Sequence, residues 1–287
     1  MSKSNLNGRA LEFYITKAII DNTKNIVQEG ETIEIQNRDI YKITEIDTKL
    51  SILFTKASII IYNWLKPQID IKTIERFHDS AGKKSDVTDI QLTDGASVLN
   101  ISVKSNHLAI KHQRPSSLIQ QFGISKGTVD DIQYRREYEE LNKMFHRKLL
   151  SVNPSAKLFN EVENIKDSYI YEPVCRKVAE KINTYGDHGS HSTDFQSFLI
   201  GKTDFIKIIV YPTKVTILQF NNLPESQKMT AEKSSTNYVN VDFHNGIKVK
   251  MRLHTASSRI TSNLSLKFDS HLSDEVNIPC IELPIVY

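Results

Sequence analysis

The sequence predicts an α/β (α+β) protein, with its strands concentrated toward the carboxyl end. Three features support this class: helical apolar spacing in the first half, strand-like runs after residue 200, and turn signals at Asp94-Gly95 and Asn245-Gly246. With 287 residues, of which 39% are hydrophobic, the chain can bury a sizeable core. We expect a first region, 1–155, that carries a catalytic hairpin, and a second, 156–287, that is helical and then β-rich. A single core shared by both regions remains an alternative.

Apolar residues recur at helical spacing in three long segments. They predict helices over 8–22, over 50–63 and over 128–152, and residues 155–183 are also mostly helical in pattern. The second helix is closed by Pro67, and Pro154 marks the end of the third. We interpret the aromatic stripe of the third helix as core rather than as a surface on which bases stack. The stripe consists of Tyr134, Tyr138, Leu141, Phe145 and Leu149.

Strand-like runs dominate the end of the chain. They cover 205–211, 215–220, 238–243, 247–253, 264–268 and 281–286. Asn245-Gly246 lies between two of these runs and predicts a hairpin. Three polar stretches are expected to be loops, at 70–84, 185–192 and 222–237. His188 and His191 fall in the second of these, and we interpret them as loop residues because no third metal ligand lies near them in the sequence.

The segment 85–114 carries the clearest chemistry. Asp94-Gly95 favours a two-residue hairpin turn, because a type I′ turn needs positive φ at both central positions. The resulting register pairs Thr93 with Ala96, Leu92 with Ser97, Ile90 with Leu99, and Asp89 with Asn100. One face is then apolar and the other is polar. The polar face carries Asp89, Asn100, Ser102 and Lys104.

Acidic side chains brought beside a lysine by a hairpin can hold Mg²⁺ against a phosphodiester, which is nuclease chemistry. The register makes Asp89 the principal metal ligand. Asp86 remains a second candidate, because strand ends often bulge. In this arrangement Lys104 would lie against the attacking water and the scissile phosphate.

This pattern resembles the PD-(D/E)xK nuclease core and, more narrowly, the HaeIII-type family of type II restriction endonucleases. The resemblance rests on Asp86-Val87-x-Asp89 and on Ile101-Ser102-x-Lys104-x-Asn106-His107-x-Ala109-x-Lys111-His112-x-Arg114. Further similar stretches are Gly8-Arg9-Ala10-Leu11-Glu12, Leu199-Ile200-Gly201-Lys202-x-Asp204-Phe205, Arg252-Leu253-His254-x-Ala256-Ser257-Ser258 and Ser265-Leu266-Lys267-Phe268-Asp269. The similarity therefore spans most of the chain.

The resemblance implies a restriction-endonuclease-like core, in which helices flank a central mixed sheet. It implies Mg²⁺-dependent cleavage of double-stranded DNA at a short sequence, with 5′-phosphate ends, within a restriction-modification system in the cytoplasm. A cognate DNA methyltransferase would share the recognition site without forming a stable complex. The family's type member suggests a GC-rich palindrome such as GGCC, and a homodimer is left open.

One residue departs from the general superfamily pattern. Ser102 stands where a second acidic ligand is usual, and a hydroxyl cannot supply a full negative charge to a hard cation. By resemblance, Glu12 of the first helix can replace that carboxylate, and the Val103 carbonyl is a further metal ligand. Asn100 is another oxygen donor on the same face, although a simple polar surface role is the more natural interpretation.

Two groups of residues are candidates for DNA contact. The first follows the catalytic strand and contains Asn106, His107, Lys111, His112 and Arg114. If residues 105–112 turn helically, His107 and Lys111 share a face that suits backbone phosphates; a solvated basic loop is the alternative. The second group contains Arg252, His254, Ser257, Ser258 and Arg259. Arginine there can bond two acceptors of a guanine edge, with a surface turn as the alternative.

The composition limits the class of protein without deciding it. The formal net charge is only +3, so a DNA-binding face must come from clustered cations. Cys175 and Cys280 are too few for a zinc site or a disulfide framework, which fits a reducing cytosol. The start of the chain has no apolar leader, and no segment of about 18 apolar residues predicts membrane insertion. The alternative functions are a repair or modification-dependent nuclease and a non-catalytic DNA-binding module.

Overall fold

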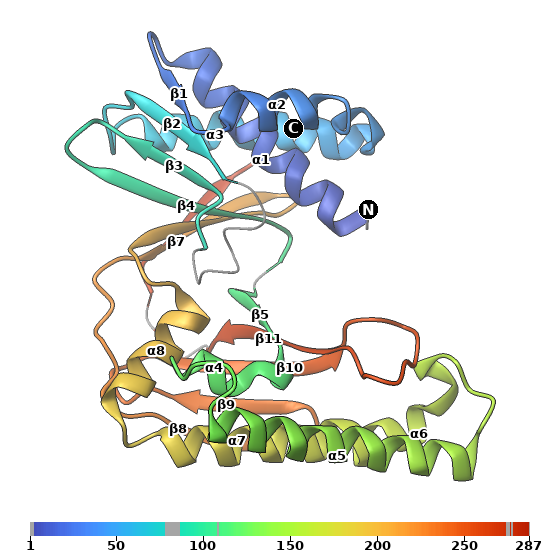
Figure 1. Ribbon diagram of the computed structural model, residues 1–287. Coiled ribbons are helices and arrows are strands. Elements are labelled where there is room, and N and C mark those ends of the chain that lie inside the picture. Colours follow the sequence, from blue (N-terminus) through green and yellow to red (C-terminus); the bar gives the residue numbers. More distant parts are fainter. Residues whose placement is uncertain (1–2, 78–86, 108, 274–275, 277, 287) are drawn as a thin grey trace. The chain divides into compact units, whose positions relative to one another are not determined.

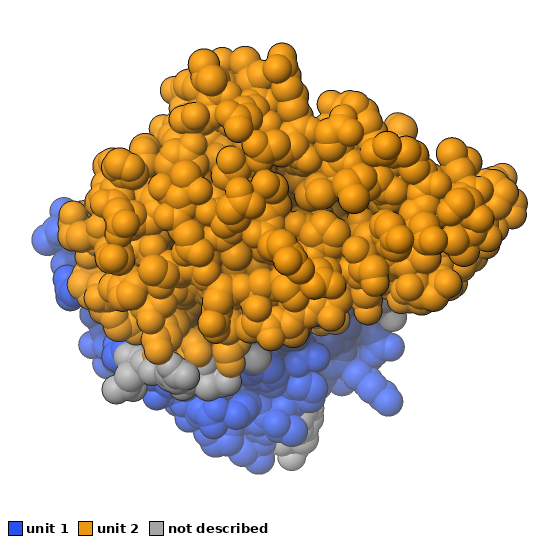
Figure 2. All heavy atoms as spheres, turned by 90° about the horizontal axis from the view of Figure 1, so that it is seen from below, with its two compact units in different colours: residues 1–108, 201–223, 278–287 blue, residues 109–200, 224–277 orange. Residues whose placement is uncertain are grey.

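The computed structural model describes the chain except for residues 1–2, 78–86, 108, 274–275, 277 and 287. It divides into two compact units. The first contains residues 1–108, 201–223 and 278–287, and the second contains 109–200 and 224–277 (Figures 1 and 2). This division differs from the expected boundary at 155, because strand pairing returns the chain to the first unit twice.

A seven-stranded sheet forms the centre of the first unit, with the order β1-β2-β3-β4-β6-β7-β12. Its strands are β1 (Val27–Glu29), β2 (Thr73–Arg76), β3 (Ile90–Thr93), β4 (Val98–Ser105), β6 (Phe205–Val210), β7 (Lys214–Phe220) and β12 (Cys280–Pro284). The pairs β1–β2 and β4–β6 are parallel and the other pairs are antiparallel. The mixed sheet implied by the family resemblance is thus confirmed.

Helices α1 (Lys3–Asn22), α2 (Thr32–Ile40) and α3 (Thr48–Leu65) belong to this unit (Figure 1). The α1 and α3 helices include the two helices expected at 8–22 and 50–63. Their buried residues, such as Leu11 and Phe54, join the apolar face of the sheet in one core with Ile101 and Ile208. Burying this face leaves the opposite, polar face of β3 and β4 to carry the chemistry.

The β3–β4 hairpin forms, but its register differs from the predicted one. Thr93 pairs with Val98 and Ile90 with Ile101, so the loop has four residues, 94–97, instead of two. The wider loop is held by the Asp94 carboxylate, which accepts the backbone N–H groups of residues 96 and 97 at 2.8 and 2.6 Å. The observed register differs from the predicted one by two residues. Because side chains along a strand alternate with a period of two, such a shift keeps each side chain on the same face. The predicted division into apolar and polar faces therefore holds.

The second unit is built around a five-stranded antiparallel sheet with the order β5-β11-β10-β9-β8. Its strands are β5 (Lys111–Gln113), β8 (Thr230–Ser235), β9 (Tyr238–Asp242), β10 (Lys248–Thr255) and β11 (Leu266–Leu272). Its helices are α4 (Leu118–Gln121), α5 (Val129–Val152), α6 (Glu163–Lys166), α7 (Glu172–Tyr185) and α8 (Gly189–Ile200). The hairpin predicted at Asn245-Gly246 joins β9 to β10. The aromatic stripe of α5 is largely buried, as expected for core.

Three segments expected to be loops contain regular structure. Residues 70–84 include β2, residues 222–237 include β8, and α8 begins inside the stretch 185–192. Strands β2 and β8 are four and six residues long and rich in polar residues, so their strand conformation depends on pairing with distant strands rather than on a local pattern. Residues 105–112 were considered as a helical turn or as a basic loop, but Lys111–Gln113 form β5 because they pair with β11.

Candidate active site

Asp89 immediately precedes β3 and is the acceptor at the centre of the site. Its Oδ2 atom accepts the Val103 backbone N–H at 2.6 Å and the Ser102 hydroxyl at 3.2 Å. The Lys104 ammonium donates to the same oxygen at 3.3 Å. Among the described residues nothing donates to Oδ1 of Asp89. The site thus has a fixed carboxylate with one oxygen available for a ligand.

Lys104 reaches Asp89 because β3 and β4 are paired. The side chains of Ser102 and Lys104 are two residues apart on β4 and lie on the same face of the sheet. The Lys104 side chain is 31% exposed and that of Asp89 is 24% exposed, so both are partly open to solvent. The ion pair is therefore accessible to a substrate and is not part of the core.

Glu12 is the second carboxylate of the site. It is held on α1, where Arg76 donates to its Oε2 atom at 3.1 Å. Burial, aided by the negative charge of Asp89, raises the pKa of Glu12 to about 7, although Arg76 and Lys104 oppose the shift. The dependence on Asp89 and Lys104 shows that Glu12 lies within electrostatic range of both.

A buried ionic network supports Glu12. Arg76 lies on β2 with its side chain fully buried, and it also binds Asp39 at 2.8 Å and the Gln36 side chain at 2.6 Å. Burial alone would raise the pKa of Asp39. The hydrogen bond from Arg38 and the positive charges of Arg76, Arg38 and Arg9 outweigh this effect, so the pKa of Asp39 is lowered. Sequence reasoning missed this network, because Arg76 lies in a segment that looked like a loop.

Lys207 is a further cation that the sequence did not reveal. It lies on β6 opposite Ser102, on the face that carries Lys104, and is 1% exposed. Burial, together with the nearby charge of Lys104, lowers the pKa of Lys207 to about 7. A lysine inside the otherwise apolar run Phe205–Val210 was the only signal available in the sequence.

The donor set suits a hard divalent cation. Mg²⁺ takes oxygen ligands and is commonly bound by one or two carboxylates together with waters and substrate phosphate. Asp89 offers an unused carboxylate oxygen, and Glu12 is an anion when deprotonated. No cluster of three or more acidic, histidine or cysteine ligands occurs within the described residues, so a fully protein-built cage is absent there.

Several predicted residues of the first unit lie outside this cluster. Asp86 is not among the described residues. Asn100 accepts from the Gln91 side chain at 2.8 Å and donates to the Asp204 carbonyl at 3.0 Å. Asn106 has a positive φ of 52° just after β4 and, like His107, is exposed.

The remaining predicted DNA contacts belong to the second unit. Because residues 111–113 form β5, the helical face proposed for His107 and Lys111 was wrong. The Lys111 ammonium lies 4.1 Å from the centre of the Phe198 ring, and Arg114 binds the Ser265 hydroxyl at 3.0 Å. His112 contacts Asp269.

The second recognition group lies on β10 and just after it. Arg252 and His254 are on the strand, where His254 contacts Asp269 at 2.8 Å. Ser257, Ser258 and Arg259 follow in a turn. The backbone carbonyl of Ser258 accepts from residue 159, and Arg259 forms an isolated bridge with residue 158. The structure therefore separates strand residues from turn residues within this group.

A mixed sheet with a carboxylate–lysine pair at a hairpin defines the class of restriction-endonuclease-like nucleases. The model of the family "HaeIII restriction endonuclease" matches residues 8–230. The chain belongs to this family, whose members are type II site-specific deoxyribonucleases. It is also 27% identical to the type II restriction enzyme HaeIII of Haemophilus aegyptius over 325 aligned positions, which cover 99% of this chain and 98% of that enzyme.

Two further findings complete the comparison. No solved structure matches the chain. Among the described residues, no helix has the length and apolar character needed to span a membrane.

Proposed function

We propose that this restriction endonuclease cuts double-stranded DNA by Mg²⁺-dependent hydrolysis at a short sequence and leaves 5′-phosphate ends. The observation that carries the proposal is the contact of Lys104 with Asp89 at 3.3 Å, with Glu12 in electrostatic range of both. Asp89, Glu12 and the Val103 carbonyl would hold the cation, with Asp86 as an additional ligand. When bound, Mg²⁺ supplies positive charge to the phosphate and to the leaving oxygen.

The chain's own groups have separate tasks in this mechanism. The Lys104 ammonium stabilises the negative charge that develops on the phosphate and favours hydroxide as the attacking species. The N–H of Val103 and the hydroxyl of Ser102 fix the Asp89 carboxylate, so that it does not have to reorganise during the reaction. Arg76 holds Glu12 in place through the contact of its guanidinium with Oε2 at 3.1 Å.

The biological setting follows from this activity. An enzyme that cuts a short sequence would also cut its host, so the host site must be modified. We place the protein in a cytoplasmic restriction-modification system, where a cognate DNA methyltransferase recognises the same site without forming a stable complex with it. Cleavage of both strands can be achieved by a homodimer that presents two such sites.

The direct test is digestion of plasmid DNA by the purified protein. Wild-type protein with Mg²⁺ should cut at discrete positions, whereas EDTA or the Asp89→Asn variant should abolish cutting. Ligation of adaptors that require 5′-phosphates, followed by sequencing of the ends, identifies the recognition site and the end chemistry. Random nicking, or equal cutting by Asp89→Asn, would rule out the proposed site.

Ser102 supports a second candidate function. Without a carboxylate at this position the protein can be a DNA-binding module that does not cut. In that case wild-type protein binds duplex DNA and leaves the plasmid intact in Mg²⁺ and in Mn²⁺. A modification-dependent nuclease would instead cut only methylated plasmid, so matched methylated and unmethylated substrates should be compared.

A further inference from the structure

The five-stranded sheet of the second unit has one apolar and one polar face. In β10, the buried residues Val249, Met251 and Leu253 alternate with polar ones. The residues on the opposite face of this strand are Lys248, Lys250, Arg252 and His254. Because alternate residues of a strand point to opposite faces, one strand places four basic side chains on the same side.

Neighbouring strands extend this polar face sideways. The pairing of β9, β10, β11 and β5 aligns the row Tyr238, Arg252, Asp269 and His112. A second row aligns Asn240, Lys250 and His271. We refer to these two rows, together with Lys248, His254 and Lys267, as the polar sheet face. It brings together one DNA-contact candidate of the first group, His112, and two of the second, Arg252 and His254.

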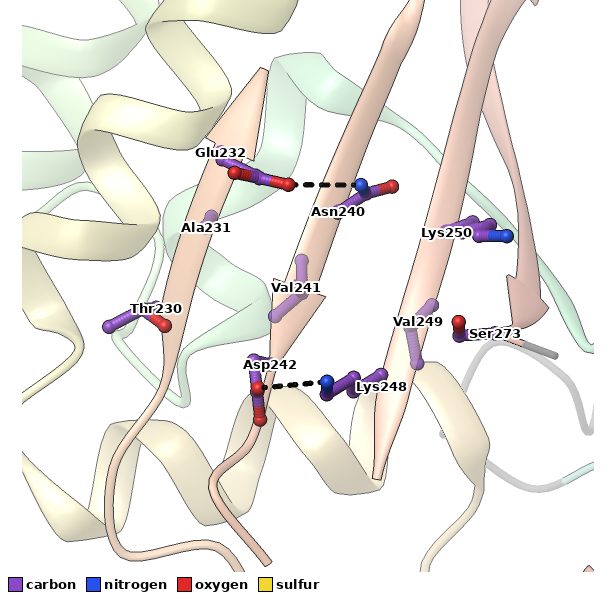
Figure 3. Close-up of a pocket in the computed structure, with 10 residues that line it drawn as sticks. All are labelled: Thr230, Ala231, Glu232, Asn240, Val241, Asp242, Lys248, Val249, Lys250 and Ser273. Atoms are coloured by element: carbon purple, nitrogen blue, oxygen red, sulfur yellow. Dashed lines mark hydrogen bonds and ion pairs between the residues drawn. The ribbon is translucent and has the colours of Figure 1, made fainter. Parts of the chain in front are cut away.

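Two acidic residues of β8 and β9, which border the polar sheet face, are paired with neighbours. Glu232 accepts from Asn240 at 3.2 Å, and Asp242 lies 3.8 Å from Lys248 (Figure 3). These residues border a hollow of about 480 Å³ over β8, β9 and β10 (Figure 3). Arg252, by contrast, is exposed and makes no hydrogen bond or ion pair with any described residue. Its guanidinium is thus available to bind a ligand.

Asp269 holds two imidazole rings on the polar sheet face. Its Oδ1 atom lies 2.5 Å from Nδ1 of His112, and its Oδ2 atom lies 2.8 Å from Nε2 of His254. Burial raises the pKa of Asp269, but the close contact with His254 and the nearby His112 and Lys267 outweigh it, and the net pKa is lowered. The carboxylate is therefore kept ionised, and it fixes both rings beside Arg252.

Resting on the nuclease function proposed above, we infer that the polar sheet face reads base edges of the duplex. Arg252 is the base-contacting residue, and Asp269 is a positioning residue that acts through His112 and His254. An antiparallel sheet often has one solvated face, so polarity alone would prove nothing. The excess of cations, the unpartnered Arg252 and the carboxylate shared by two imidazoles fit a polyanion that presents ordered acceptors. Arginine pairs with the two acceptors of guanine, and strands are an established means of reading a groove.

The test compares specific with non-specific affinity. Once end sequencing has given the cut site, binding to a cognate and a scrambled duplex is titrated in Ca²⁺, which prevents cutting. Arg252→Ala should lower the cognate-to-scrambled affinity ratio at least about fivefold. Arg176→Ala is the matched control, because it removes the same charge from an exposed position on α7 in the same unit. This control should leave the ratio unchanged.

The role of Asp269 is tested by two substitutions, whose cognate-to-scrambled affinity ratios are measured in the same way. Thermal unfolding confirms that each variant folds. Asp269→Ala should lower the ratio, and Asp269→Glu should restore part of it, because glutamate can still accept from both imidazoles. Unchanged ratios in folded Arg252→Ala and Asp269→Ala would overturn the inference, while cutting by the wild type would leave the nuclease function intact. Wild-type protein that neither binds nor cuts duplex DNA would overturn both.

Discussion

Ser102 and Lys207 lie opposite each other on the parallel strands β4 and β6, on the same face of the sheet. Ser102 stands where the general PD-(D/E)xK pattern has an acidic residue, so Asp89 is the carboxylate that the hairpin itself supplies. Lys207 places a buried amine beside that position, and burial lowers its pKa to about 7. The charge there is therefore less negative than a carboxylate would make it, so a divalent cation at this site would depend on the carboxylates of Asp89 and Glu12.

We predict that Lys207→Met stabilises the protein at neutral pH. The pKa of Lys207 falls from its ordinary 10.5 to about 7 in the folded chain, so the unfolded chain binds more protons between these values. The contribution of Lys207 to the free energy of unfolding should therefore rise as pH increases from about 7 toward 10. Urea unfolding at pH 7 and pH 9.5 should show a gain from Lys207→Met that shrinks at the higher pH. A gain that grows with pH would contradict the sign of this shift.

We predict that Lys104→Ala separates binding from cleavage. The substitution removes a charge beside the reacting phosphate and leaves the other DNA contacts in place. In Ca²⁺ the affinity for DNA should stay within about tenfold, a difference of about 1.4 kcal/mol. In Mg²⁺ the single-turnover cleavage rate should fall by at least about 100-fold. Cleavage at the wild-type rate would remove Lys104 from the active site.

The sequence predicted the parts of the site that depend on local pattern. Asp89, Ser102 and Lys104 share a face because alternation along a strand survives a two-residue error in register. The loop length was not predictable, because the Asp94 side chain closes a wider turn than Asp-Gly alone suggests. Arg76 and Lys207 were missed because their roles come from strand pairing across distant segments, which no local periodicity encodes.

We predict that binding of a divalent cation depends on the ionisation of Glu12. Its pKa is raised to about 7, so the carboxyl is largely protonated at pH 6 and must release a proton to bind a cation. Mn²⁺ affinity of the DNA-free protein, measured by calorimetry, should rise from pH 6 to pH 8. In Glu12→Gln the affinity should be weaker and this rise smaller. An identical pH dependence in wild type and variant would exclude Glu12 as a ligand.

The raised pKa of Glu12 also predicts how the stability of the protein depends on pH. Between pH 4.5 and about 7 the unfolded chain ionises Glu12 while the folded chain keeps it protonated, so this residue's contribution lowers the free energy of unfolding as pH rises. Above about pH 7 the loss is complete and constant. Relative to the wild type, Glu12→Gln should therefore become progressively more stable across this window. Urea titrations at pH 5 and pH 7.5 measure the difference.

Finally, we predict that the Arg76–Asp39 pair is essential to the stability of the first unit. Both side chains are at most 1% exposed and lie 2.8 Å apart, so removing either one deprives the other of its buried counter-charge and leaves Asp39 only Arg38 and Arg9, or Arg76 only Glu12. Asp39→Asn or Arg76→Met should lower the free energy of unfolding by about 3–5 kcal/mol. The double variant should lose less than the sum of the two, because the Arg76–Asp39 interaction can be lost only once.

The matched control for this pair is Lys17–Asp21 on α1, an ion pair at 2.7 Å whose side chains are 54% and 51% exposed. Asp21→Asn should change the free energy of unfolding by no more than about 1 kcal/mol, because solvent screens an exposed pair. Urea titration of the four variants and the wild type gives the comparison. If Asp39→Asn lowered the free energy of unfolding as little as Asp21→Asn, Glu12 alone would be a sufficient counter-charge for Arg76. In that case, adding Glu12→Gln to Asp39→Asn should cause the large loss of stability.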